Sequence, residues 1–475
     1  MKIVRNFSFL TLSQTGERFF NFLLVVILAR YLGVEEYGIY ALTVSFVGMF
    51  GNLFDGGLNF LLTREIASSR KNEAVFFTQV LLLKIIIGAI VFIALIAAAF
   101  VMQYNTKVFF TIVLFAVAAL IVSFSNTFRA LFIGHERMEF EGGLAVLYRF
   151  LGFIGIFFLL KAGISFPVLI LPHVAAALIV LSLSYYLQTK IFPLVKSKGY
   201  LNIKKMEIFK QAAPFAVWAI MGEIYFNIDS VILSKLADIK TLANYNAANR
   251  LVFASLLLAN GLTLAIYPHF AKMWSGNKAH VYTTFNLIFK LLFFISLPLS
   301  FVVSFFAEDI IVFVFGSKFY ESGSILRILV WAMIPLYLYH LTGRTLEAIG
   351  EQKFVAKTIF FCVVGNILFN IIFIPFYGAK GAAITSVTTS ALLLSIHLVF
   401  INKKVGMFQI GDIVHKIVVP FACFVLTLII TTNFLNWMIS AALGFLVYFF
   451  ILYTLKGIKW DEIEILLGHE RKIYE

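Results

Sequence analysis

Residues 81–101 read LLLKIIIGAIVFIALIAAAFV, an apolar stretch in which Lys84 is the one charged residue. A helix rises 1.5 Å per residue, so about 20 apolar residues cross the ~30 Å hydrocarbon core of a bilayer. Apolar runs of comparable length recur along the whole chain. The stretch therefore predicts a transmembrane helix, and its recurrence predicts a polytopic membrane protein.

The composition of the whole chain agrees with this interpretation. Of its 475 residues, 61% are hydrophobic and 13% are charged, and the mean hydropathy is +0.96. Soluble domains carry about 25% charged residues. This chain has too little polar surface for a soluble enzyme, a secreted disulfide scaffold or a free nucleic-acid-binding protein. Its net charge of +14 is typical of a membrane protein whose cytoplasmic loops collect Lys and Arg.

The apolar runs predict an all-α protein with about fourteen transmembrane helices. Only helices and closed barrels satisfy every backbone group in lipid, and barrel strands would show about 10 residues of strict alternation. The expected spans are 7–29, 38–62, 75–101, 108–132, 143–161, 165–187, 212–234, 242–268, 284–306, 324–348, 354–375, 380–401, 413–433 and 436–455.

The distribution of Lys and Arg predicts the orientation. If the N-terminus is cytoplasmic, that side also receives the Lys-rich segment 190–210, the pair Lys403 and Lys404, and the C-terminal tail. The cytoplasmic side then holds roughly three times as many Lys and Arg residues as the other. We therefore expect a multi-pass protein of the cell (inner, cytoplasmic) membrane with both termini in the cytoplasm.

Weak internal repetition predicts two related halves. Ile133-Gly134-His135-Glu136-Arg137 follows the fourth expected span, and Ile349-Gly350-Glu351-Gln352-Lys353 follows the tenth. Lys84 and Lys290 occupy similar places in the third and ninth spans. Transporters are often built from such duplicated halves. The predicted domains are a six-helix bundle (1–190), a cytoplasmic Lys-rich connector (191–211), a second six-helix bundle (212–402), an appended helix pair (403–456) and a cytoplasmic tail (457–475).

Cations inside the spans are the first candidate site residues: Arg18, Lys84, Arg149, Arg250 and Lys290. An ionisable group inside a span costs about 2.5–3.5 kcal/mol on insertion scales, so each needs a partner or a hydrated surface. One hypothesis is a cationic path for a diphosphate-bearing substrate. The alternative is that each cation pairs structurally with a carboxylate on a neighbouring helix.

Acidic residues inside the spans are Glu17, Asp55, Glu223 and Asp229. They are candidates for binding a coupling H⁺ or Na⁺, or for acting as fixed charge partners of the cations. Asn52, Asp55 and Asn59, at i, i+3 and i+7, would form one polar stripe on the second expected helix. For the single histidines His173, His340 and His397, a hydrogen-bonded packing role is favoured over a proton relay.

Motifs for enzymatic chemistry are absent from the sequence. It contains no GxxxxGK[ST] phosphate loop, no second His at metalloprotease spacing after His135-Glu136, and no Asp-x-Asp pair. Cys362 and Cys423 both lie in apolar segments, which favours small buried hydrophobes over a disulfide or a metal site. We therefore expect a transporter with no cofactor and no metal site.

Several short motifs resemble those of Wzx-type O-antigen and oligosaccharide flippases, the polysaccharide exporters of the multidrug/oligosaccharidyl-lipid/polysaccharide (MOP) superfamily. They are Ala29-Arg30-Tyr31-Leu32-Gly33 with Glu35-Glu36-Tyr37-Gly38, Asp55-Gly56-Gly57-Leu58-Asn59 with Arg64-Glu65-Ile66-Ala67, Gly134-His135-Glu136-Arg137-Met138, Tyr245-Asn246-Ala247-Ala248-Asn249-Arg250, and Phe315-Gly316 with Phe319-Tyr320. The resemblance implies two bundles in a V shape that work by alternating access. It also implies transfer of undecaprenyl-diphosphate-linked oligosaccharide, an O-antigen or exopolysaccharide repeat unit, from the cytoplasmic to the outer leaflet, and a possible polysaccharide polymerase partner.

Two other functions stay open at this point. One is another transporter of the same superfamily, either a peptidoglycan-precursor flippase or a cation-coupled small-molecule antiporter. In an antiporter of cationic drugs we expect carboxylates to dominate the cavity, whereas here cations are at least as numerous inside the spans. The other is a membrane-embedded polysaccharide polymerase, which predicts a large extracytoplasmic loop that the spacing of the spans does not provide.

Overall fold

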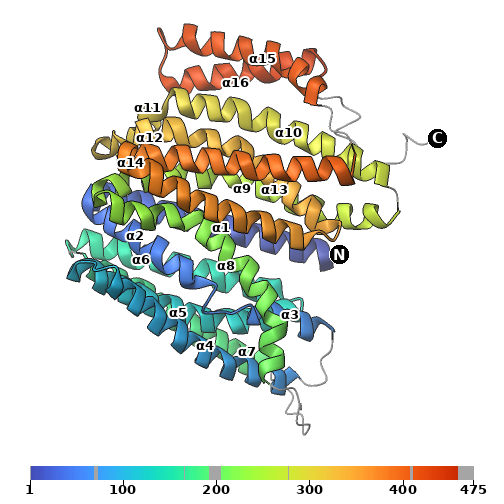
Figure 1. The fold of residues 1–475 in the computed structure, drawn as a ribbon. Helices are drawn as coiled ribbons and strands as arrows, with labels where there is room; N and C mark the ends of the chain where they lie inside the picture. Colours follow the sequence, from blue (N-terminus) through green and yellow to red (C-terminus); the bar gives the residue numbers. More distant parts are fainter. Residues whose placement is uncertain are drawn as a thin grey trace. The chain divides into compact units, whose positions relative to one another are not determined.

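Helices connected by short turns make up the architecture (Figure 1). The structure is a computed structural model that describes residues 2–68, 73–164, 166–191, 205–276, 278–406 and 410–457. Within these ranges no β-strand occurs, and the all-α expectation is confirmed. Most of the predicted Lys-rich connector and nearly all of the predicted tail lie outside the described residues.

The chain divides into two compact units. Unit 1 comprises Met1–Arg250, Val314–Phe319 and Val363–Ala382, and unit 2 comprises Leu251–Phe313, Tyr320–Cys362 and Ala383–Glu475. The helices up to the middle of α9 are α1 (Lys2–Leu32), α2 (Val34–Gly51), α3 (Leu58–Ser68), α4 (Glu73–Val101), α5 (Thr106–Gly134), α6 (Met138–Lys161), η1 (Val168–Ile170), α7 (Leu171–Ile191), α8 (Lys205–Leu236) and α9 (Ile239–Gly276).

The remaining helices follow α9 in the chain, and most of their residues belong to unit 2. They are α10 (Lys278–Phe305), α11 (Ala307–Phe315), η2 (Ser317–Phe319), α12 (Ser322–Leu329), η3 (Val330–Ala332), α13 (Met333–Ala348), α14 (Gln352–Lys404), α15 (Ile410–Thr431) and α16 (Trp437–Thr454). The division into two six-helix bundles and an appended pair stays a prediction.

Eight helical segments among the described residues are long and apolar enough to cross a bilayer. They are Glu73–Val101, Thr106–Gly134, Met138–Lys161, Val168–Ile191, Val281–Phe305, Ser322–Ala348, Gln352–Lys404 and Trp437–Thr454. The protein is thus a multi-pass membrane protein, and the total of fourteen spans stays a prediction. The first eligible segment contains the stretch 81–101.

The second predicted span, 38–62, is not one helix. α2 ends at Gly51 and α3 begins at Leu58, and turns occupy the residues between them. Gly57 has φ +74°, and a Cβ atom at this position would lie 2.4 Å from the carbonyl oxygen of Ala212 on α8. Only glycine fits both the left-handed backbone and this close approach. The prediction of one continuous helix over 38–62 is therefore wrong for residues 52–57. We call residues 52–57 the α2–α3 break.

The helix α14 contains a second interruption. The 53 residues of Gln352–Lys404 include Gly378, whose φ of 54° and ψ of −133° are not helical. A non-glycine residue adopts a positive φ rarely because its Cβ clashes with the backbone. The kink therefore separates two helical segments, as the predicted spans 354–375 and 380–401 require.

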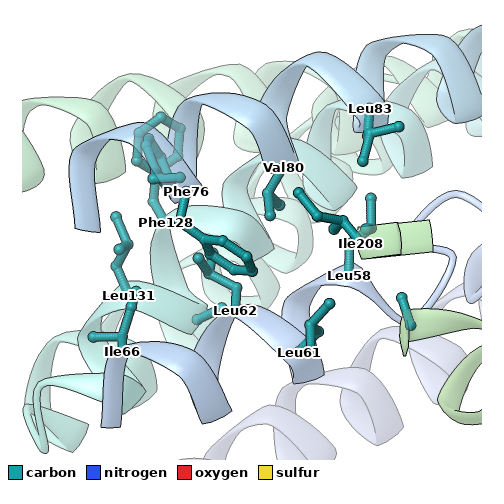
Figure 2. Close-up of a cluster of buried hydrophobic side chains, with 13 residues drawn as sticks. Leu58, Leu61, Leu62, Ile66, Phe76, Val80, Leu83, Phe128, Leu131 and Ile208 are labelled. Carbon is teal, nitrogen blue, oxygen red and sulfur yellow. The ribbon is translucent and has the colours of Figure 1, made fainter. Parts of the chain in front are cut away.

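The α2–α3 break is anchored beside a buried apolar cluster of unit 1 (Figure 2). Leu58, Leu61 and Leu62 of α3 belong to it, together with side chains of α4 and α5, and Ile208 and Ala212 of α8. The three α3 leucines are fully buried. Close packing of these leucines against α4, α5 and α8 therefore fixes the position of the N-terminal residues of α3.

Candidate functional site

A buried ion pair occupies the α2–α3 break. The Lys84 ammonium of α4 lies 2.9 Å from Oδ1 of Asp55 and donates to the Asn59 amide oxygen at 3.2 Å. Both carboxylate oxygens of Asp55 also accept the backbone N–H of Asn59 at 3.3 Å. Lys84 is only 1% exposed. We call Lys84, Asp55 and Asn59 the Lys84 cluster; its contacts are those of an ion pair between neighbouring helices.

A second set of polar contacts links the same break to α8. The Asn52 amide donates to the Ala219 carbonyl oxygen at 3.2 Å and to Oε1 of Glu223 at 3.4 Å. The Asn227 amide donates to Oε2 of Glu223 at 3.2 Å. Glu223 is half-buried, and these hydrogen bonds to neutral amides satisfy both of its oxygens. The sequence analysis identifies Glu223 as a candidate and misses that Asn52 contacts it.

Asp229 joins three helices of unit 1. Its carboxylate accepts the Tyr245 hydroxyl of α9 at 2.6 Å and the Asn370 amide of α14 at 2.7 Å. Asn370 also donates to the Asn366 amide oxygen at 2.9 Å. Asp229 is 6% exposed and Asn370 is completely buried. The sequence analysis identifies Asp229 and does not identify Asn370, which lies 141 residues further along the chain.

Charged residues of α1, α5 and α6 form the start of a cationic region. Arg129 of α5 lies 2.5 Å from the Glu141 carboxylate and 4.0 Å from that of Glu17. Arg149 and Arg18 are both within electrostatic range of Glu17. Arg18 is exposed, and Arg149 is half-buried. Arg18 and Arg149 therefore share one acidic neighbour, Glu17. Arg129 also contacts Glu17, but it pairs more closely with Glu141.

Two buried tyrosines of α2 extend this region to α9. The Tyr40 hydroxyl is within electrostatic range of both Arg149 and Arg250, and Arg250 also lies beside Tyr37. Both rings are at most 3% exposed, whereas Arg250 is half-buried. The sequence motifs at 37–38 and 245–250 thus meet in space. We call Arg18, Arg149 and Arg250, with Tyr37 and Tyr40, the arginine cluster.

The structure divides the five candidate cations into two groups. The three arginines lie in unit 1 with accessible or half-buried side chains, near shared neighbours. Lys84 lies in unit 1 and Lys290 in unit 2, and they are only 1% and 6% exposed. Lys84 and Lys290 are thus both buried, and neither side chain is accessible in this structure; a place for them on a cationic path stays a prediction.

These charged side chains belong to a multi-pass membrane protein. The polysaccharide biosynthesis protein family matches residues 3–274, and the MatE family matches residues 214–372. Because the first match covers more than half of the sequence, the chain belongs to the polysaccharide biosynthesis protein family. The resemblance to the polysaccharide exporters of the MOP superfamily is thereby confirmed.

Individual relatives agree with this assignment. The chain is 22% identical over 400 residues to the probable low-salt glycan biosynthesis flippase Agl15 of Haloferax volcanii, covering 83% of this chain and 82% of the relative. It is 20% identical to a putative O-antigen transporter of Shigella dysenteriae, over 82% of this chain and 98% of the relative. The lipid II flippase MurJ in an inward closed conformation has a similar fold, with a TM-score of 0.74 and 18% identity over 94% of this chain and 97% of MurJ.

Proposed function

We propose that this protein is a flippase for lipid-linked glycans. In detail, it moves an undecaprenyl-diphosphate-linked oligosaccharide, an O-antigen or exopolysaccharide repeat unit, from the cytoplasmic to the outer leaflet by alternating access. We place it in the cytoplasmic membrane with both termini in the cytoplasm. The family match and the flippase and O-antigen transporter names of the relatives support this substrate class.

The observation that carries the proposal is the accessibility of the arginine cluster. Arg18 lies midway along the 31-residue helix α1 and is exposed. A guanidinium at that depth is costly in lipid, so we infer that this face of α1 contacts water. Guanidinium groups bind phosphate oxygens through paired, charge-assisted hydrogen bonds. Arg18, Arg149 and Arg250 therefore suit the diphosphate, while the polyprenyl chain stays in lipid.

Transport against a gradient needs an energy source, and we assign it to a coupling H⁺ or Na⁺ bound by a carboxylate. Asp229 and Glu223 are the favoured residues because neutral hydroxyl and amide groups donate to their oxygens. Asp55 is less suitable because Lys84 neutralises it, and Glu17 because it lies among arginines. A polysaccharide polymerase is the partner that would consume the flipped product.

The test is to delete the gene and measure lipid-linked oligosaccharide in each leaflet, with restoration by wild type, Arg18→Gln or Arg327→Gln. Arg327 is the matched control because it is exposed and pairs with Glu308 in unit 2. We expect accumulation in the cytoplasmic leaflet that wild type and Arg327→Gln clear and Arg18→Gln does not.

Three results would contradict the proposal. Accumulation that Arg18→Gln clears as well as wild type would show that the arginine cluster is not the substrate path. A deletion that leaves leaflet distribution unchanged but alters drug or ion sensitivity would favour the antiporter. Accumulation of a peptidoglycan precursor instead of an oligosaccharide would favour the other flippase.

A further inference from the structure

The two segments of α14, which meet at the Gly378 kink, pack against each other in antiparallel order. Three contacts join them: His397 with the Thr358 hydroxyl at 2.9 Å, Phe400 with Phe354 at 3.8 Å between ring centroids, and Lys404 with Glu351 at 2.9 Å. In these pairs the residue number rises along one segment as it falls along the other. The beginning and the end of α14, both in unit 2, therefore lie together at one end of the helix pair.

Lysine side chains gather at this shared end. Lys353 and Lys357 lie in the first two turns of α14, and Lys403 lies in its last turn. All three side chains are exposed. Because Lys404 contacts Glu351, the neighbouring Lys403 lies level with the first turn of α14, which carries Lys353. We call Lys353, Lys357 and Lys403 the lysine patch.

The acidic residues that precede the lysine patch in the chain already have partners. The Glu351 carboxylate lies 2.9 Å from the Lys404 ammonium, and the Glu347 carboxylate of α13 lies 2.9 Å from the Arg344 guanidinium. These two carboxylates are thus neutralised without the lysine patch. Cations in excess of the carboxylates around them attract anions, so this end of unit 2 is suited to a negatively charged ligand.

An exposed apolar face begins at the lysine patch and continues along both segments of α14. Phe360 and Phe361 follow Lys357 by three and four residues and share its helix face; they are 49% and 58% exposed. Val399, four residues before Lys403, is 59% exposed. Gln352–Lys404 is apolar and long enough to cross a bilayer. We therefore infer that these apolar side chains contact acyl chains and that the lysine patch lies at the level of the lipid headgroups.

We propose that the lysine patch binds an anionic phospholipid. The lipid phosphate lies against the three lysines, and the acyl chains lie along Phe360, Phe361 and Val399. Lysine clusters at the ends of transmembrane helices attract anionic headgroups, and each lysine strengthens binding about fivefold. On the predicted orientation this lipid belongs to the cytoplasmic leaflet. The site lies in unit 2 and needs neither the arginine cluster nor a transported glycan, so the inference goes beyond the proposed function.

The combination of charge and apolar surface favours an anionic lipid over other ligands. A soluble phosphate would use the lysines and leave the apolar face unused. An acidic protein would approach from water and would not reach side chains that lie among acyl chains. A zwitterionic phospholipid would use the apolar face, but the positive group of its headgroup would oppose the lysines. An anionic phospholipid uses both parts of the surface.

The experiment measures lipid binding to the purified full-length protein in detergent by native mass spectrometry. Dioleoyl phosphatidylglycerol and dioleoyl phosphatidylcholine are titrated separately, and the dissociation constant of the first bound lipid is compared. The patch variant is Lys353→Gln with Lys357→Gln and Lys403→Gln. The control variant removes the same charge at three other exposed lysines: Lys161→Gln, Lys240→Gln and Lys318→Gln.

We expect wild type and the control variant to bind phosphatidylglycerol more tightly than phosphatidylcholine. The patch variant should bind phosphatidylglycerol about 10- to 100-fold more weakly, with its affinity for phosphatidylcholine unchanged. Glycerol phosphate, which carries the charge without acyl chains, should not displace the lipid at equal concentration. Farnesyl diphosphate, a short analogue of the proposed substrate lipid, should not displace it at equal concentration either.

Four results would overturn the inference. Equal affinity of the patch and control variants for phosphatidylglycerol would leave the lysines to an acidic protein. A wild type that does not distinguish the two phospholipids would show that charge plays no part. Displacement by glycerol phosphate would indicate a site for soluble phosphate, and displacement by farnesyl diphosphate would assign the lysine patch to the substrate. None of the first three results bears on transport, so the proposed function stands if they occur.

A second measurement covers a patch variant that does not fold. Salt screens the attraction between exposed charges, so wild-type affinity for phosphatidylglycerol should fall as the ammonium acetate concentration rises, while affinity for phosphatidylcholine should not. An affinity for phosphatidylglycerol that is independent of salt would overturn the inference without any variant.

Discussion

The Lys84 cluster and the arginine cluster both begin from the same sequence signal, an isolated cation within an apolar segment. The Lys84 ammonium lies 2.9 Å from the Asp55 carboxylate, and the Lys84 side chain is 1% exposed. At Arg18 the structure leaves the side chain exposed, and at Arg149 and Arg250 it leaves half-buried guanidinium groups near tyrosine rings. The first arrangement is an ion pair between helices, and for the second we propose binding of an anion.

The physical reason for the difference is the availability of an acidic partner. Lys84 faces the α2–α3 break, where Asp55 is freed from a regular helix and can turn toward α4. Next to the arginine cluster, the carboxylates Glu17 and Glu141 already contact Arg129. A cation with its own carboxylate needs no ligand, and cations that outnumber their carboxylates bind anions readily.

The largest effect should follow from breaking the Lys84 cluster. Lys84→Met leaves Asp55 without its cation, and removing one partner of a buried ion pair destabilises by about 3–5 kcal/mol. We expect a lower unfolding temperature in detergent and less protein in the membrane. The matched control is Lys84→Met with Asp55→Asn, which keeps an acceptor for the Asn59 N–H and should recover much of the stability. Wild-type stability of the single variant would contradict a structural role.

Much of the fold could be predicted from sequence because lipid restricts the options. Helical spans follow from the length of apolar runs, as the agreement between the predicted spans and α4, α5 and α16 illustrates. The α2–α3 break escapes this reasoning because Asn52, Asp55 and Asn59 at helical spacing resemble a stripe, which conceals the turn at Gly56-Gly57. Both glycines have positive φ, and the glycine pair is the signal that could have located the turn.

The site could be predicted in residue identity and only partly in arrangement. Each candidate cation and acid is visible as a polar residue in an apolar run, because the cost of burying charge makes such residues rare. The pairing of these residues depends on tertiary contacts. One example is the approach of both Arg149 and Arg250 to Tyr40. Those contacts join residues more than 100 positions apart. Hydropathy carries no information on such pairings. The difference in burial between the two lysines, Lys84 and Lys290, and the three arginines of the arginine cluster is therefore visible only in the structure.

The arginine cluster should show the opposite behaviour to Lys84. Arg250→Gln removes a half-buried charge beside the Tyr37 and Tyr40 rings, and neutral tyrosines, unlike a carboxylate, are not left as uncompensated charges. We therefore expect the unfolding temperature to stay within a few degrees of wild type. Transport should fall about 10- to 100-fold, which corresponds to one lost charge-assisted interaction of about 1.5–3 kcal/mol.

Arg250→Lys sharpens this test, because lysine keeps the charge and loses the paired geometry of the guanidinium. We expect its transport to lie between that of the Arg250→Gln variant and that of wild type. Leaflet-resolved lipid-linked oligosaccharide is the readout, and Arg64→Gln, at an exposed arginine paired with Glu65, is the control. If Arg250→Gln loses stability as severely as Lys84→Met, the two clusters do not differ in the way argued above.

The smallest effect concerns the contact that connects the α2–α3 break to α8. Asn52→Ala removes hydrogen bonds to the Ala219 carbonyl oxygen and to Glu223, at a cost of about 0.5–1.5 kcal/mol each at most. The break itself is held by other means, namely the buried leucines of α3 and the close approach of Gly57 to Ala212. The expected loss of stability is therefore modest, well below that of Lys84→Met.

Transport measurements distinguish a structural role of the hydrogen bond between Asn52 and Glu223 from a role in ion coupling. If Glu223 helps to bind the coupling ion, Asn52→Ala changes the environment of that carboxylate, and the dependence of transport on external pH or Na⁺ shifts while the maximum rate changes little. The control is Asn227→Ala, which removes the other amide donor to Glu223 and should shift the dependence in the same direction. A shift with Asn52→Ala alone would mean that Asn52 acts through the position of α2 and not through Glu223, and Asp229 would then be the remaining carboxylate for ion coupling.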